Sequence, residues 1–205
     1  MSDARVALTF DAEHPSRAGN DPRAPDAILD ALATAGVPAT FFVQGRWASA
    51  HPRVARRIAE DGHLVGNHSH YHAPMLLLTA EGFRVDVAEA ERRIADIVGV
   101  DPRPWFRCPF GGGADRRAVL EALHALGYRD VGWDVDPEDW REGRSPDDVR
   151  GAAVDGARLA GGVVLFHTWP SATAAALPGI IAELRDVGLS FVTVADSIRE
   201  AADGP

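Results

Sequence analysis

Strand-like and helix-like patterns of apolar residues alternate along the whole chain. Runs rich in β-branched and aromatic residues predict strands at Val6–Phe10, Thr40–Val43, His63–Gly66, Trp105–Arg107, Asp130–Trp133, Gly162–Phe166 and Ser190–Val194. Helical periodicity and caps predict helices at Asp26–Ala35, Arg53–Asp61, Thr79–Gly99, Asp115–Leu126, from Ser145 onward, at Leu177–Val187 and, briefly, at the C-terminus. About seven strands alternating with helices favour an α/β fold of parallel β–α–β units, either a barrel or an open sheet.

Polar residues gather where five of these strands end. They are the segments Thr9–His14, Asn67–His72, Arg107–Gly111, Asp134–Trp140 and His167–Trp169. In parallel α/β folds the carboxyl ends of the strands meet at one edge, and chemistry collects there. One polar cluster would be weak evidence, but five on successive strand ends indicate a functional site.

Three histidines within five residues give the sharpest local signal. His68 and His72 are four residues apart, so one helical turn would direct both at a single point. Neutral imidazoles are good zinc ligands, although a lone loop histidine is more often simply solvated. We therefore expect a metal site at His68 and His72, with His70 facing away from the metal or supporting it by hydrogen bonding.

Two strand-end residues have both an ordinary and a functional interpretation. Asp11 follows an apolar run and could cap the next helix, but a carboxylate there is costly unless it is paired or next to a metal. His167 ends the buried run Val163–Phe166 and could be a satisfied core histidine. A proton donor is the sharper alternative, because histidine titrates near neutrality.

Composition narrows the function classes. The length of 205 residues suits one domain, so residues 1–205 are expected to form a single domain. No apolar run approaches the ~20 residues of a membrane span. Acidic residues number 30 against 21 basic ones, without a basic run, so no nucleic-acid partner is expected. The N-terminus lacks signal-peptide features and predicts a cytoplasmic protein. Cys108 is the single cysteine, which excludes an internal disulfide.

The strand-end segments together resemble the motifs of the polysaccharide deacetylase family, also called carbohydrate esterase family four. Thr9–Asp11 is similar to the first motif, His68–His72 fits His-Ser/Thr-x-x-His, and Arg107–Gly111 fits Arg-x-Pro-aromatic-Gly. Asp139–Trp140 resembles the fourth motif, and Val163–His167 resembles the fifth. The resemblance covers nearly the whole chain and implies a distorted (β/α) barrel, similar to a TIM barrel but with fewer units.

The resemblance also implies a division of labour around a divalent metal. His68 and His72 would bind the metal with a carboxylate, Asp11 would be the general base, and His167 would be the general acid. Zinc is the expected ion, with cobalt, nickel, iron or manganese as alternatives. The metal would activate water and polarise an amide carbonyl, and each positioned proton-transfer group would contribute typically ~10²–10⁴-fold.

The remaining motif residues would support this chemistry. Arg107 and Asp139 would hold the base and the acid, the backbone N–H of Phe110 would help stabilise the oxyanion, and Trp140 would wall the acyl pocket. Trp169, two residues past His167, is the best tryptophan candidate for stacking on a sugar, although tryptophans are also ordinary barrel-rim residues.

One position departs from the family pattern. The common motif has two adjacent aspartates, of which the second is the metal ligand, and Ala12 stands at that second position here. Glu13 is two residues past Asp11, and on an extended chain such residues point to the same side, so Glu13 is the expected third ligand. His14 is a weaker substitute, and loss of the ligand would make the chain an inactive relative.

The expected function is metal-dependent hydrolysis of an amide bond, foremost N-deacetylation of an amino sugar or glycan. One alternative is another cytoplasmic C–N bond, in a cyclic imide, ureide or formamide. A second alternative is a weakly active or non-catalytic carbohydrate-binding relative. The expected partner is a small-molecule or oligosaccharide substrate, and the sequence does not fix an oligomeric state.

Overall fold

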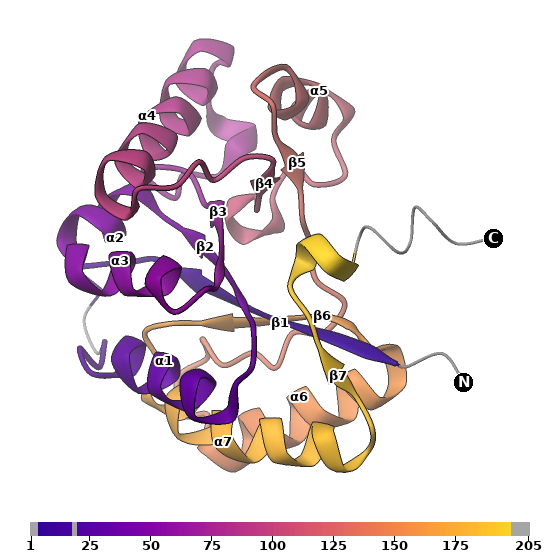
Figure 1. The fold of residues 1–205 in the computed structure, drawn as a ribbon. Coiled ribbons are helices and arrows are strands. Elements are labelled where there is room, and N and C mark those ends of the chain that lie inside the picture. Colours follow the sequence, from indigo (N-terminus) through magenta and orange to yellow (C-terminus); the bar gives the residue numbers. More distant parts are fainter. Residues whose placement is uncertain (1–3, 18–19, 198–205) are drawn as a thin grey trace.

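A seven-stranded parallel sheet organises the molecule. The computed structural model describes residues 4–17 and 20–197 (Figure 1). Within those ranges the strands are β1 (Arg5–Ala12), β2 (Thr40–Val43), β3 (Leu64–Asn67), β4 (Trp105–Phe106), β5 (Arg129–Asp130), β6 (Gly162–His167) and β7 (Ser190–Phe191). The strand order is β5-β4-β3-β2-β1-β6, and β7 pairs with the first residues of β1. The α/β class and the barrel-like sheet predicted from the sequence are confirmed.

The sheet curls into a half-barrel that the chain after β5 partly closes. An isolated parallel bridge joins Val135 to Val164 in β6. The Leu165 N–H donates to the Val135 carbonyl at 2.9 Å, and the Asp134 N–H donates to the Val163 carbonyl at 2.8 Å. The segment that follows β5 therefore runs beside β6 and narrows the gap between the two ends of the sheet.

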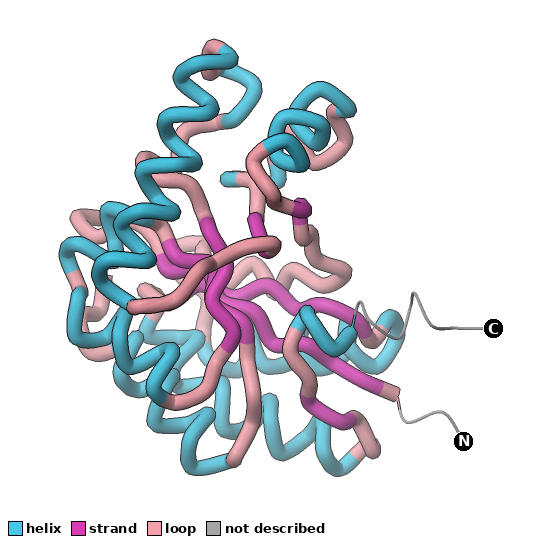
Figure 2. Tube along the Cα trace, turned by 45° about the horizontal axis from the view of Figure 1, so that its top comes forward, coloured by secondary structure: helices cyan, strands magenta, loops and turns pink. Residues whose placement is uncertain are grey.

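Helices cover the outside of the curved sheet (Figure 2). They are α1 (Ala24–Ala35), α2 (Gly45–Ala50), α3 (Pro52–Glu60), α4 (Ala80–Val98), α5 (Arg117–Ala125), α6 (Pro146–Ala160) and α7 (Ser171–Asp186), with 3₁₀ turns η1 (Met75–Leu77) and η2 (Pro109–Gly111). In the outer layer α7 packs between α6 and α1, and α1 contacts α3. Helix α4 packs against both α3 and α2. In the described ranges, no helix is long and apolar enough to cross a membrane.

Local signals in the sequence set the helix ends. The Thr79 hydroxyl accepts the Gly82 N–H at 3.1 Å where α4 begins. Ser145 and Asp148 form a reciprocal capping box at the start of α6. Gly99, with φ of 82°, ends α4 in the left-handed conformation that glycine adopts without steric cost. These caps confirm the predicted starts at Thr79 and Ser145.

Alternation along β1 separates the core from the site. Phe10 stacks between Phe41 of β2 and Phe166 of β6, with ring centroids 5.0 and 5.5 Å away. These rings belong to the main core, which packs beneath α1 and α7. Because neighbouring residues of a strand face opposite sides, Thr9 and Asp11 point to the other side of the sheet, the inside of the half-barrel.

The strand predictions that lose most residues in the structure are Asp130–Trp133 and Ser190–Val194. The Asp130–Trp133 prediction shrinks to β5, because the guanidinium of Arg107 takes the Val131 and Gly132 carbonyls that a longer strand would use for pairing. The Ser190–Val194 prediction shrinks to β7, and the Val194 N–H bonds instead to the Thr40 hydroxyl at 3.2 Å.

Two helical predictions also need correction. Helix α7 begins six residues before the predicted Leu177, because Thr173 and Ala176 extend its buried face, and it contains Pro178. Helix α2 was not predicted, since its six residues are too few for a periodic pattern. Residues 194–197 are helical, and the rest of the expected terminal helix lies outside the described residues.

Candidate metal centre and active site

The proposed base and acid are neighbours in the sheet. Asp11 near the end of β1 is the register partner of His167, the last residue of β6. Both residues are buried, at 4% and 8% exposure. An apolar strand pattern before each residue buries the strand, and the final polar residue is left at the carboxyl edge. The structure thus brings together two residues that lie far apart in the sequence.

Arg107, just after β4, holds Asp11. Its Nη1 donates to Asp11 Oδ1 and to the Thr9 hydroxyl, each at 2.9 Å. The guanidinium carbon also lies 4.2 Å from the centroid of the Phe42 ring. The other carboxylate oxygen, Asp11 Oδ2, lies 3.5 Å from His68 Nε2. One oxygen of Asp11 is therefore anchored by the arginine, and the other faces the histidines.

Asp139 holds His167 in a comparable way. His167 Nδ1 lies 2.7 Å from Asp139 Oδ1, and the His167 backbone N–H donates to Oδ2 at 2.8 Å. The Thr173 hydroxyl of α7 donates to the same Oδ2 at 2.6 Å. Burial lowers the pKa of His167, but the charge and hydrogen bond of Asp139, together with the charges of Glu13 and Asp11, outweigh burial and raise that pKa to about 9. The imidazole is therefore cationic at neutral pH.

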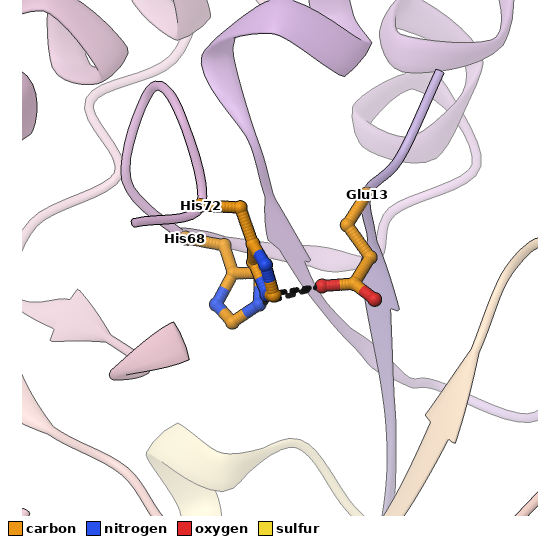
Figure 3. A group of neighbouring side chains, drawn as sticks. All are labelled: Glu13, His68 and His72. Atoms are coloured by element: carbon orange, nitrogen blue, oxygen red, sulfur yellow. Dashed lines mark hydrogen bonds and ion pairs between the residues drawn. The ribbon is translucent and has the colours of Figure 1, made fainter. Parts of the chain in front are cut away.

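The side chains of Glu13, His68 and His72 converge on one another (Figure 3). One donor atom from each residue lies within 4.8 Å of the others. Glu13 Oε2 contacts both Nε2 atoms, at 3.3 Å for His68 and closer for His72. Figure 3 shows the two rings approaching from one loop and the carboxylate approaching from the end of β1. The structure therefore brings the three expected metal ligands together.

The two histidines meet through a loop, which corrects the expected helical turn. No helix spans residues 68–72, and Ser69 and His72 have φ of 60° and 57°. The loop is fixed from within, because the Ser69 N–H donates to the Asn67 side chain and the His72 N–H donates to the Ser69 hydroxyl. His70 lies in the same loop but lines a different cavity. This agrees with the expectation that it faces away from the metal group.

The electrostatics of the group favour a cation. Burial raises the pKa of Glu13, but hydrogen bonds from His14, His68 and His72 outweigh it and hold that pKa far below its usual range. His14 reaches the second oxygen, with its Nε2 3.1 Å from Glu13 Oε1. A buried carboxylate in this ionised state needs positive charge beside it, and histidines or a metal ion can supply that charge.

The site opens into a cavity of about 320 Å³. Asp11, Glu13, His72 and His167 lie in its wall, and the other lining residues are His14, Arg17, Phe110, Trp133, Asp136, Trp140, Leu165 and Trp169. Phe110 has φ of 59°, and its exposed ring lies edge-on to His72 with centroids 4.4 Å apart. The predicted Phe110, Trp140 and Trp169 all face this cavity.

Comparison with known proteins shows the family. A sequence model described as polysaccharide deacetylase matches residues 1–131. A peptidoglycan-N-acetylglucosamine deacetylase of Bacillus cereus is 32% identical over 195 residues, covering 93% of this chain and 67% of the relative. The chain belongs to the polysaccharide deacetylase family.

Solved structures agree with this membership. A family 4 carbohydrate esterase from Streptomyces lividans, solved with acetate, is 33% identical, has a TM-score of 0.78 and covers 92% of both chains. A pseudoenzyme of the same esterase family from Bacillus anthracis is 28% identical and has a TM-score of 0.82, covering 95% of this chain and 65% of the other. The polysaccharide deacetylase family is a family of hydrolases that also contains a pseudoenzyme. Whether a member is active therefore depends on the residues of its own site.

The donor set fits the metal on which polysaccharide deacetylases depend. Two imidazoles and one carboxylate are the protein ligands of many catalytic zinc sites, which keep a fourth position open. His68 Nδ1 bonds to the Arg107 carbonyl at 2.9 Å, which leaves its Nε2 lone pair for a metal and fixes the ring. The carboxylate in this group of three is that of Glu13.

Sequence reasoning gave no role to three residues of the site. Thr173 supports Asp139 from α7, and a polar residue on an apolar helix face was the available signal. Arg17 lines the cavity from a loop, where no periodicity points to it, and Asp136 lies in the predicted polar segment Asp134–Trp140 without an assigned role. Cys108 is buried beside Arg107, and burial raises the pKa of its thiol, which agrees with a packing role.

Proposed function

We propose that this chain is a metal-dependent N-deacetylase that hydrolyses the acetamido group of an amino sugar or glycan. The observation that carries the proposal is the convergence of two supported proton-transfer groups, Asp11 and His167, on a Glu-His-His metal group. The family membership supports the same chemistry.

A divalent ion held by Glu13, His68 and His72 would lower the pKa of water and polarise the carbonyl. Asp11 Oδ2 accepts the proton of the attacking water, because Oδ1 is bonded to Arg107. His167 Nε2 donates a proton to the leaving nitrogen, since Nδ1 is held by Asp139. The Phe110 N–H stabilises the developing oxyanion, and Trp140 bounds the space for the acyl group.

Substrate turnover tests the proposal directly. The purified chain should release acetate from N-acetylated amino sugars, lose that activity with a chelator and recover it with zinc. Cyclic imides and ureides should be poor substrates. The His68→Ala/His72→Ala double variant should bind no stoichiometric metal and should be inactive. Equal turnover with and without metal, or activity confined to imides, would refute the proposal.

Metal affinity tests the unusual third ligand. Glu13→Gln should weaken zinc binding by at least about 10–100-fold, since even partners outside the ligand set cost that much. Glu13→Asp should also bind weakly because its shorter side chain does not reach the histidines. Asp136→Asn is the matched control, because Asp136 lines the same cavity but contacts neither His68 nor His72. Titration calorimetry measures all three variants, and unchanged affinity in Glu13→Gln would remove Glu13 from the ligand set.

A further inference from the structure

Arg17 is the one arginine or lysine among the described residues that line the active-site cavity. Its guanidinium carbon lies 4.0 Å from the centroid of the Trp169 ring. The backbone fixes this position, because the Arg17 N–H donates to the His14 carbonyl at 3.2 Å and the Asp21 N–H donates to the Trp169 carbonyl at 3.3 Å. Arg17 is thus held to the residue that follows Glu13, and Asp21 is held to the segment that follows His167.

The carboxylates of the cavity already have partners in the protein. Asp11 bonds to Arg107, and Glu13 bonds to its histidines. Asp136 accepts the Glu138 N–H at 2.8 Å and faces the Trp140 indole N–H at 3.5 Å. None of these carboxylates pairs with the guanidinium of Arg17.

Arg17, in contrast, has no ion-pair or hydrogen-bond partner for its side chain in residues 4–17 and 20–197, and only the Trp169 ring holds it. A stacked guanidinium keeps its planar fork of N–H donors free at the ring edge, and that fork matches a carboxylate or phosphate. Stacking on tryptophan also reduces the entropy that the side chain loses when it binds.

We propose that Arg17 binds an oxyanion of the substrate, so that the preferred substrate is an N-acylated amino sugar that carries a phosphate or carboxylate group. This inference rests on the proposed deacetylase function. The Trp169 and His167 rings are 5.8 Å apart, which places Arg17 on the side of the cavity where the amine leaves. The anionic group therefore belongs to the sugar and not to the acyl group.

Matched substrate pairs test the inference. The ratio of kcat/KM for N-acetylglucosamine 6-phosphate to that for N-acetylglucosamine measures phosphate preference, and N-acetylmuramic acid replaces the phosphate in the carboxylate arm. The wild-type chain should prefer at least one anionic sugar. Arg17→Gln should reduce that preference by about 10–100-fold, the usual effect of losing a charged hydrogen bond. Arg17→Lys should retain only part of it, because the ammonium lacks the bidentate fork.

Arg141 offers a matched control. Its guanidinium carbon lies 5.9 Å from the centroid of Trp140, another cavity tryptophan, but its Nη1 is already paired with Glu138 at 2.6 Å. Arg141→Gln should therefore keep the wild-type preference. A wild-type chain that treats neutral and anionic sugars alike, or an Arg17→Gln variant with the wild-type ratio, would overturn the inference while leaving deacetylation intact.

Binding measurements separate this inference from the proposed function. If no N-acetylated sugar is turned over, calorimetry with the zinc-loaded protein compares the Kd of the same sugars in wild type and Arg17→Gln. Tighter binding of an anionic sugar that is lost in the variant supports the role of Arg17 even though the proposed function has failed. Equal Kd values in the two proteins refute the role of Arg17.

Discussion

The site contains two buried charge pairs of opposite arrangement, which we call the Asp11 wall (Asp11 with Arg107) and the His167 wall (His167 with Asp139). On one wall a cation, Arg107, holds a carboxylate, Asp11. On the other wall a carboxylate, Asp139, holds an imidazole, His167. The two working groups are register partners on adjacent strands, and each uses one atom for its supporting residue and turns another atom toward the cavity. One sheet edge therefore presents a proton acceptor beside a proton donor.

The difference between the walls lies in what the partner does. Asp139 makes the largest favourable contribution to the pKa of His167, which is raised to about 9 against the opposing effect of burial. Arg107 instead compensates a buried charge and also ties down the carbonyls of Val131 and Gly132. We therefore expect changes at the His167 wall to alter the pH dependence of activity. Changes at the Asp11 wall should lower the free energy of unfolding.

Removing either working group should have the largest effect on turnover. Asp11→Asn and His167→Ala should each reduce kcat by about 10²–10⁴-fold, because each removes one positioned proton-transfer group. Both variants should keep the fold and bind one zinc ion per chain, since neither residue belongs to the Glu-His-His group. Deacetylation kinetics and metal analysis check this together. A rate near the wild-type value in either variant would show that its wall is not part of the chemistry.

Removing Arg107 should mainly destabilise the chain. Arg107→Met should lower the free energy of unfolding by about 3–5 kcal/mol, because it leaves Asp11 as an uncompensated buried charge. Denaturant unfolding measures this loss. Adding Asp11→Asn to the same variant should restore part of the stability, while the part due to the Val131 and Gly132 carbonyls should remain lost. No recovery in the double variant would contradict the charge argument.

Replacing Asp139 should shift the pH profile and have the smallest effect at low pH. Protonated His167 is the active donor, so wild-type activity should fall as pH rises through its pKa, which Asp139, with Glu13 and Asp11, raises to about 9. Asp139→Asn removes that charge and should move the alkaline limb at least about one pH unit lower. Asp136→Asn, in the same segment, should leave the limb in place. An unmoved limb in Asp139→Asn would mean that another group titrates there.

The sequence predicted the strand ends and most of the site because burial and alternation act locally. An apolar run that ends in a polar residue identified Asp11 and His167, and two-residue spacing on an extended chain identified Glu13. The family resemblance, confirmed by the comparisons, added the supporting roles of Arg107 and Asp139. Single-domain organisation and a cytoplasmic location stay predictions.

The features that could not be predicted depend on contacts between distant segments. Ser69 and His72 adopt left-handed conformations in place of a helical turn, and Asp86 of α4 holds their loop by accepting the His70 and Tyr71 N–H groups. Strand β5 is short because Arg107 takes its neighbouring carbonyls. Arg17 gains its position from the Trp169 ring, more than a hundred residues away in the sequence. No local pattern encodes these three arrangements.

The single cysteine, Cys108, is buried, so its reaction with a thiol reagent can measure local opening of the structure. Cys108 follows Arg107, its backbone N–H donates to Asp130 at 2.9 Å, and burial raises the pKa of its thiol. A thiol reagent can therefore react only when the segment between β4 and η2 opens. Because the chain has one cysteine, the rate of thiol labelling measures the free energy of opening of this segment without any introduced probe. Slower labelling with a ligand bound would show that occupancy of the cavity suppresses this opening.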